Sequence, residues 1–71
     1  MSQEGEKIAE FFTKHKGEIN GLHRDKYWRN GGWNGLMDAI GDIMKRYKFR
    51  YDSDVLDSDE WEHIVKQELG G

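Results

Sequence analysis

Apolar side chains recur at helical spacing in the first third of the chain. The stripe consists of Ile8, Phe12, His15, Ile19 and Leu22, with Phe11 beside it. Its spacings of three and four residues are those of one face of an amphipathic α-helix. Acidic residues precede the stripe and basic residues precede Gly17, as is typical of the two ends of a helix. We therefore predict a helix over 3–16 and a short helical turn over 18–23, the alternative being one helix to Leu22 with Gly17 inside it.

A second amphipathic stripe predicts a helix over 34–47. Its apolar face consists of Trp33, Leu36, Met37, Ile40, Ile43, Met44 and Tyr47. Asn34 is a residue type favoured at an N-cap, and Asp42 is placed to pair with Arg46 one turn later. Gly35 and Gly41 lie inside this helix, where each costs about 1 kcal/mol relative to alanine. Such glycines indicate either the close approach of another backbone or neutral drift of the sequence that the protein tolerates.

Two segments beside this helix lack its periodicity. Residues 24–32 end in the turn signal Asn30-Gly31-Gly32, so we expect a connector there. Residues 46–51 alternate between arginine or lysine and tyrosine or phenylalanine. A period of two predicts an extended segment near 48–52 with one aromatic and one basic face, either the exit of the helix or a short edge strand.

The C-terminal region carries a strong signal for the start of a helix. Asp57 is followed three residues later by Glu60, the spacing of a capping box, and Leu56 and Trp61 have the spacing of a hydrophobic staple. The apolar stripe that follows consists of Trp61, Ile64, Val65 and Leu69. Gly70 is suited to end the helix. A third helix is therefore expected after Leu56.

These elements predict an all-α protein in which three helices pack as a small bundle, within a single domain of 71 residues. The predicted core consists of Ile8, Phe11 or Phe12, Ile19, Leu22, Trp33, Leu36, Ile40, Ile43, Met44, Trp61, Ile64, Val65 and Leu69. A chain this short buries only about 60% of its unfolded surface. Small domains often gain stability from a partner or from self-association, so a homo-oligomer is among the expectations.

Charge is distributed unevenly along the chain. There are 11 basic and 14 acidic side chains, for a net charge of −3. Residues 14–50 hold nine of the basic and four of the acidic side chains, a net charge of +5, whereas residues 51–71 have a net charge of −6. This segregation predicts a polarised surface that would steer a charged partner. The alternative is that the two blocks neutralise each other within the fold.

Composition argues against several classes of function. Without cysteine there is no disulfide and no thiolate metal site, which fits a reducing compartment, and we expect a cytoplasmic protein. No run of apolar residues exceeds two, so we expect no membrane helix. The three histidines lack zinc-site spacing, and the aspartates of 52–59 lack the glycine of a calcium loop. In the absence of a catalytic motif we expect neither an enzyme nor a metal or other cofactor.

The favoured hypothesis is a protein-binding module, a small acidic regulator or inhibitor. Tryptophans on both sides of the glycine turn, with an arginine beside them, have the composition of a binding hot spot. The candidate partner-binding residues are Tyr27, Trp28, Arg29, Trp33, Asp52 and Asp54. The alternative for these residues is structural, with the rings closing the core and the carboxylates solvated.

A second hypothesis is the binding of nucleic acid, in which cations neutralise phosphates and aromatic rings stack on bases. The candidate residues are Arg24, Lys26, Lys45, Arg46, Lys48 and Arg50. This hypothesis requires the two ends of the second helix to share one face. The negative net charge of the chain speaks against it.

Overall fold

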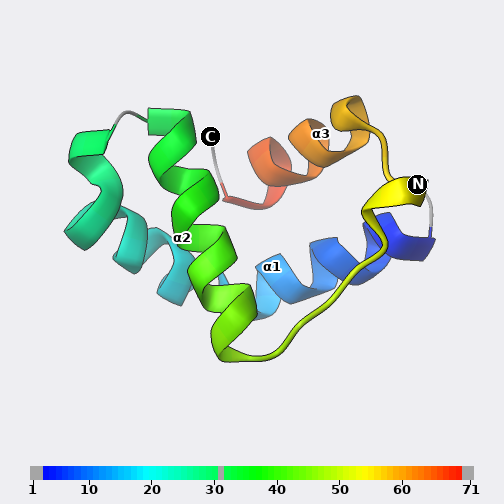
Figure 1. Ribbon diagram of the computed structural model, residues 1–71, viewed down its shortest axis with the longest axis horizontal. Coiled ribbons are helices and arrows are strands. Elements are labelled where there is room, and N and C mark those ends of the chain that lie inside the picture. Colours follow the sequence, from blue (N-terminus) through cyan, green and yellow to red (C-terminus); the bar gives the residue numbers. More distant parts are fainter. Residues whose placement is uncertain (1–2, 31, 70–71) are drawn as a thin grey trace. The chain divides into compact units, whose positions relative to one another are not determined.

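Every regular element of the computed structural model, which describes residues 3–30 and 32–69, is helical. The elements are α1 (Gln3–Leu22), the π-helical turn η1 (His23–Tyr27), the 3-10 turn η2 (Trp28–Asn30), α2 (Gly32–Arg46), the 3-10 turn η3 (Ser53–Val55) and α3 (Ser58–Leu69) (Figure 1). The all-α class with three main helices is therefore confirmed.

The chain divides into two units. Unit 1 comprises Met1–Lys16 and Tyr51–Gly71, and unit 2 comprises Gly17–Arg50. The helix α1 runs through this division with Gly17 inside it, and its backbone leaves helical geometry at His15 (φ −113°, ψ 16°). No separate turn forms over 18–23, because α1 continues to Leu22 and passes directly into η1. The single-helix alternative is therefore the one that the chain adopts, with a kink.

In unit 1, the first part of α1 and α3 share an apolar core. The buried side chains are Ile8, Phe11, Phe12, Leu56, Ile64, Val65 and Leu69. The ring of Phe12 meets the ring of Trp61 edge to face at 5.7 Å between centroids, and Tyr51 stacks on Trp61 at 5.4 Å. Thr13 donates a hydrogen bond of 2.7 Å to the Glu68 carboxylate. These contacts hold α3 and the segment before it against α1.

The start of α3 follows the prediction. The Asp57 carboxylate accepts a hydrogen bond of 2.7 Å from the backbone N–H of Glu60, which satisfies one of the free N–H groups at the helix end. Leu56, just before the cap, is buried. Asp57 is therefore confirmed as the N-cap, a role typically worth about 1 kcal/mol. Gly70, which we expected to end this helix, lies outside the described residues.

In unit 2, α2 packs on η1 and η2. A Cβ atom at Gly35 would lie 2.4 Å from the carbonyl oxygen of Tyr27, so only glycine permits this approach of the two backbones. The explanation by close approach is thereby confirmed for Gly35. A Cβ at Gly41 would meet nothing within 4 Å, so Gly41 has no such role among the described residues. The buried side chains of unit 2 are Ile19, Leu36, Ala39, Ile40, Ile43 and Met44.

The start of α2 differs from the prediction. The helix begins at Gly32, whose φ is +23°, and glycine tolerates such a value better than other residues. Asn34 therefore lies inside the first turn, and its assignment as the N-cap is wrong. Gly31, the centre of the predicted turn, lies outside the described residues.

Three side chains predicted for the core are not fully buried. Trp33 is 41% exposed, and Leu22 and Trp61 are partly exposed. Tryptophan is too large to be covered completely by the few elements of so short a chain. The core also includes Ala39 and Leu56, which the predicted apolar stripes do not contain.

Candidate functional site

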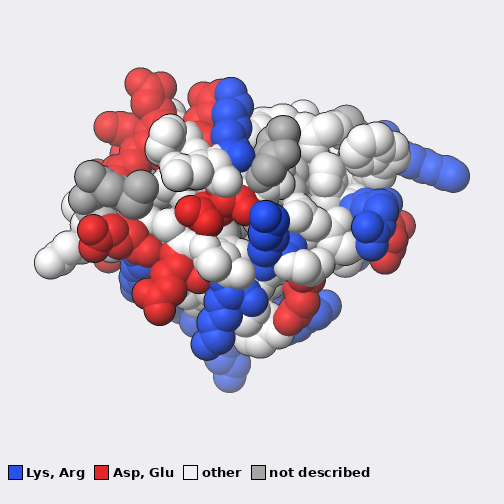
Figure 2. All heavy atoms as spheres, turned by 180° about the vertical axis from the view of Figure 1, so that it is seen from behind, with Lys and Arg blue, Asp and Glu red and all other residues white. Residues whose placement is uncertain are grey.

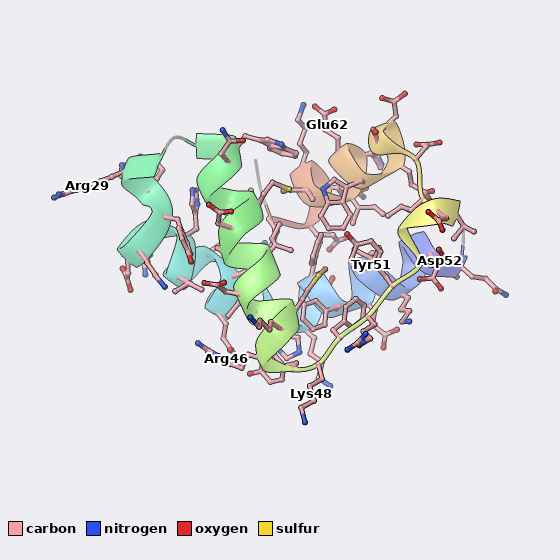
Figure 3. The ribbon with its side chains drawn as sticks, viewed as in Figure 1. Arg29, Arg46, Lys48, Tyr51, Asp52 and Glu62 are labelled. Carbon is pink, nitrogen blue, oxygen red and sulfur yellow. The ribbon has the colours of Figure 1, made fainter. Side chains whose placement is uncertain are left out.

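Two tryptophans of unit 2 are exposed around the connector between α1 and α2. Trp28 in η2 is 65% exposed, and Trp33 in the first turn of α2 is 41% exposed. Arg29 is also exposed, and its side chain extends away from the ribbon (Figure 3). We call Tyr27, Trp28, Arg29 and Trp33 the connector surface. Its exposed indoles beside a cation are the combination from which we predicted a partner site.

Tyr27 is held in place by α2. Its carbonyl oxygen lies against Gly35, and its hydroxyl donates a hydrogen bond of 2.5 Å to the carboxylate of Asp42. This hydrogen bond raises the pKa of Tyr27 above its ordinary value of 10.0, because ionisation would remove the donor and place a second negative charge beside Asp42. Lys26 also approaches Asp42, at 3.9 Å. Tyr27 therefore positions the connector, while the other members of the connector surface face outward.

Trp28 borders two hollows in the connector. One, of about 400 Å³, is lined by Asn20, His23, Arg24 and Trp28. The other, of about 500 Å³, is lined by Arg24, Asp25, Lys26, Trp28 and Arg29. The His23 ring lies 5.7 Å from the Trp28 ring, and its Nε2 is buried without a hydrogen-bond partner among the described residues. A partner would therefore meet an indole with a basic rim and hollows beside it.

Asp52 and Asp54, the acidic members of the predicted partner site, belong to unit 1. The Asp52 carboxylate accepts a hydrogen bond of 3.0 Å from the N–H of Asp54 and caps η3. The N–H of Asp52 donates to Glu4 at 2.9 Å. Asp52 therefore has a local structural role, as aspartate often has in turns. Asp54 is exposed, and the neighbouring Val55 is 56% exposed.

The six cations of the nucleic-acid hypothesis differ in their surroundings. Three lie near a carboxylate of unit 2, namely Arg24 with Asp25 at 3.5 Å, Lys26 with Asp42 at 3.9 Å and Arg46 with Glu18 at 3.3 Å. The other three, Lys45, Lys48 and Arg50, have no ion pair with a described residue of unit 2. Charged side chains lie at the surface, and none among the described residues is buried (Figure 2). The predicted set is thus partly neutralised within its own unit.

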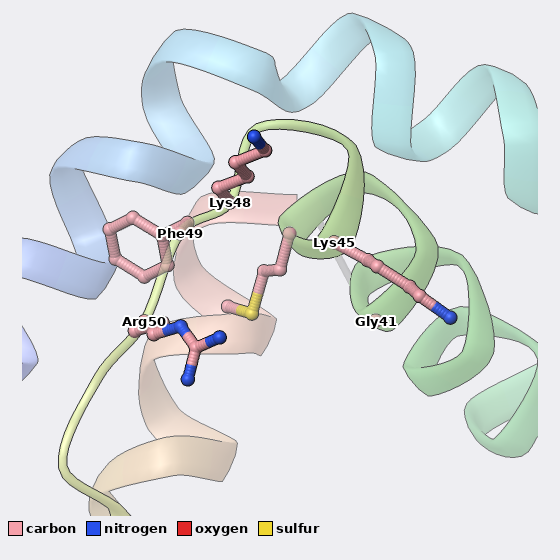
Figure 4. A pocket seen from close by; sticks show the side chains of 6 residues that line it. Gly41, Lys45, Lys48, Phe49 and Arg50 are labelled. Atoms are coloured by element: carbon pink, nitrogen blue, oxygen red, sulfur yellow. The ribbon is translucent and has the colours of Figure 1, made fainter.

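Lys45, Lys48 and Arg50 line one hollow of about 650 Å³ together with Gly41, Met44 and Phe49 (Figure 4). We call these six residues the cationic hollow. Met44 is buried and Phe49 is partly buried, so an apolar base lies beneath charged groups. The three charged side chains extend in different directions (Figure 4). This arrangement suits an extended ligand with several negative groups better than a single small anion.

The turn that ends α2 shapes this hollow. The N–H of Phe49 donates to the carbonyl of Met44 at 2.8 Å, and the N–H of Lys48 donates to the carbonyl of Lys45 at 3.2 Å. These are the two hydrogen bonds of a Schellman C-cap. Lys48 has a φ of 54° and occupies the position that glycine usually fills. The motif commonly brings together the side chains at the positions of Met44 and Phe49.

The aromatic residues of 46–51 have separate environments. The Tyr47 hydroxyl donates a hydrogen bond to Glu18, which raises the pKa of Tyr47 above its ordinary value. Phe49 lines the cationic hollow, and Tyr51 stacks on Trp61 in unit 1. The predicted common aromatic face does not form, because the positive φ of Lys48 interrupts the alternation. Residues 49–52 follow as irregular chain, and no strand occurs in the described ranges.

The apolar members of these surfaces could not be recognised from the periodicity of apolar residues alone. The predictions place Met44 in the core and Phe49 on an aromatic face, and they do not single out Val55. An apolar residue flanked on both sides by charges of one sign is the signal that links Phe49, between Lys48 and Arg50, to its hollow.

Neither a membrane-spanning helix nor a metal-binding group of side chains is found in the described part of the chain. No helix there is long and apolar enough to cross a bilayer, and no three histidine or acidic side chains are gathered as ligands. Comparison of the chain with profiles of protein families, with curated proteins and with solved structures found no match.

Proposed function

We propose that the protein is a non-enzymatic interaction module that docks a protein partner through the connector surface and regulates or inhibits it. The observation that carries this proposal is the 65% exposure of Trp28. An indole covers a large contact area and loses little conformational entropy when it is buried in an interface. Arg29 supplies the second residue type that is enriched in hot spots.

The charge distribution supports steering of such a partner. Unit 1 has ten acidic and four basic side chains, a net charge of −6, and unit 2 has seven basic and four acidic side chains, a net charge of +3. Opposite potentials on two parts of a small protein accelerate encounter and orient the partner. We keep the cytoplasm as the proposed location, which the lack of cysteine supports.

Trp28→Ala is expected to weaken partner binding by at least about tenfold, as truncation of a hot-spot tryptophan does. The immobilised chain would capture the partner from a cell extract, and calorimetry with the purified partner would give the affinities. Asp38→Ala is the control, because it truncates an exposed side chain of the same unit that lies outside the connector surface. Failure to retain a specific partner, or equal affinities for both variants, would count against the proposal.

Binding of single-stranded nucleic acid is the second candidate, favoured by the presence of Lys45, Lys48, Arg50 and Phe49 in the lining of one hollow. Phosphates would meet the cations while a base meets the ring. Titration with labelled single- and double-stranded oligonucleotides is expected to show an affinity that falls steeply with salt. Absence of binding at low salt would remove this candidate.

A further inference from the structure

We propose that the chain self-associates head to tail, with the acidic turn around Val55 of one copy seated in the cationic hollow of another. The acidic turn comprises residues 52–57, which include Asp52, Asp54, Asp57 and the exposed Val55. This interface is separate from the connector surface, so it goes beyond the proposed function and does not depend on it.

The cationic hollow offers charges that its own unit does not neutralise. Lys45, Lys48 and Arg50 form no ion pair with a described residue of unit 2, whereas Arg46 beside them is paired with Glu18. Met44 and Phe49 supply an apolar base. A Cβ at Gly41 would enter open space, so this glycine leaves the surface of α2 free for another chain to approach. The hollow therefore suits an apolar side chain flanked by carboxylates.

The presence of lysine at position 48 is not explained by the stability of the local backbone. At a φ of 54° a lysine is disfavoured relative to glycine, and glycine is the usual choice at this position of a Schellman cap. Disfavoured backbone conformations of this kind are often found at functional sites. A cation held at this position, at the rim of a hollow with an apolar base, points to a negatively charged ligand.

The acidic turn has the complementary chemistry. Val55 is 56% exposed and follows the exposed Asp54. The turn is ordered by its own hydrogen bonds, from the Asp54 N–H to the Asp52 carboxylate at 3.0 Å and from the Val55 N–H to the Asp52 carbonyl at 3.3 Å. A preformed segment loses little entropy when it docks. The Val55 side chain can therefore pack on the apolar lining of the hollow, while Asp54 and its acidic neighbours pair with the cations of the hollow.

A second copy fits the hollow better than a nucleic acid does. The net charge of the chain is −3, which disfavours a phosphate backbone, whereas the acidic turn of a second copy supplies the negative charges that complement the hollow. Each copy would offer both a turn and a hollow, so the contact joins two different surfaces and is heterologous. Because few side chains take part and the charges are exposed, the association should be weak and sensitive to salt.

Sedimentation of the full chain from about 10 μM to about 1 mM tests the proposal. At an ionic strength of about 0.05 M the average mass is expected to rise with concentration, and at about 0.5 M it should fall back to that of the monomer. Lys48→Glu and Asp54→Lys should each abolish the rise. Lys14→Glu and Glu10→Lys make the same changes of net charge at exposed positions that belong to neither the hollow nor the turn, and they should leave the rise intact.

Mixing the two interface variants gives the decisive result. The Lys48→Glu chain retains its acidic turn, and the Asp54→Lys chain retains its hollow, so an equimolar mixture should form 1:1 dimers and nothing longer. Lys48→Gly should weaken the association while the chain remains folded, which separates the role of the cation from the shape of the turn. Trp28→Ala should associate like the unaltered chain, whatever becomes of partner binding.

Four outcomes would overturn the proposal. The first is a monomer at every concentration at low salt, and the second is a mixture of the two variants that stays monomeric. The third is an equal loss of association in the charge-matched controls, which would show that net charge alone is responsible. An oligonucleotide that binds the monomer with an affinity lost in Lys48→Glu would assign the hollow to nucleic acid instead.

Discussion

Replacing Gly35 by alanine is expected to lower the free energy of unfolding by about 2–3 kcal/mol, in the upper range for overpacking. The added Cβ would lie 2.4 Å from the carbonyl oxygen and 3.1 Å from the carbonyl carbon of Tyr27. Both are backbone atoms, so the clash cannot be relieved by a side-chain rotation and η1 must move away from α2. The better helix propensity of alanine recovers at most about 1 kcal/mol. Because a core of this size supplies only about 3–5 kcal/mol, roughly half of the stability would be lost.

Gly41→Ala is the matched control, since it makes the same change in the same helix. A Cβ there meets nothing within 4 Å, so the variant should gain up to about 1 kcal/mol from helix propensity. Urea unfolding followed by circular dichroism measures both variants. Opposite signs are expected, and a gain of stability in Gly35→Ala would show that α2 and η1 do not pack as closely as described.

The periodicity of apolar residues predicted the helices because the same side chains that repeat along the sequence form the cores. Ile40 and Ile64, for example, are both in stripes and both buried. The N-cap at Asp57 was equally predictable, since a cap depends on a local hydrogen bond between residues three apart. The start of α2 could not be predicted in the same way. Asn34 has a residue type that is common at N-caps, but the helix begins two residues earlier, at Gly32.

The connector surface was predicted from composition, whereas the cationic hollow was not. Exposure of Trp28 follows from the size of its ring in a chain with little to cover it. The hollow depends on the φ of Lys48, and lysine carries no signal for a left-handed conformation as glycine would. An alternating pattern of charges and rings looks the same in sequence whether it continues as a strand or is folded back by a turn.

Phe12→Ala is expected to cost about 3–5 kcal/mol, the range for truncation of a buried phenylalanine. Phe12 is completely buried, and its ring packs edge to face on Trp61, which in turn stacks with Tyr51. Removal of the ring would leave a cavity in the core of unit 1 and would remove one of the ring contacts of Trp61. The expected loss is comparable to the whole stability of a domain of this size. Thermal and urea unfolding should therefore find most of the variant unfolded at 25 °C.

Phe12→Leu separates the loss of volume from the loss of the aromatic contact. Leucine refills most of the cavity, so this variant should remain folded and cost less than about 1.5 kcal/mol. Val55→Ala, an exposed truncation in the same unit, should change the free energy of unfolding by no more than about 0.5 kcal/mol. If Phe12→Ala unfolded at the same urea concentration as Val55→Ala, the ring would not be part of a closed core. A folded Phe12→Leu with an unfolded Phe12→Ala would instead show that unit 1 depends on filling one site between α1 and α3.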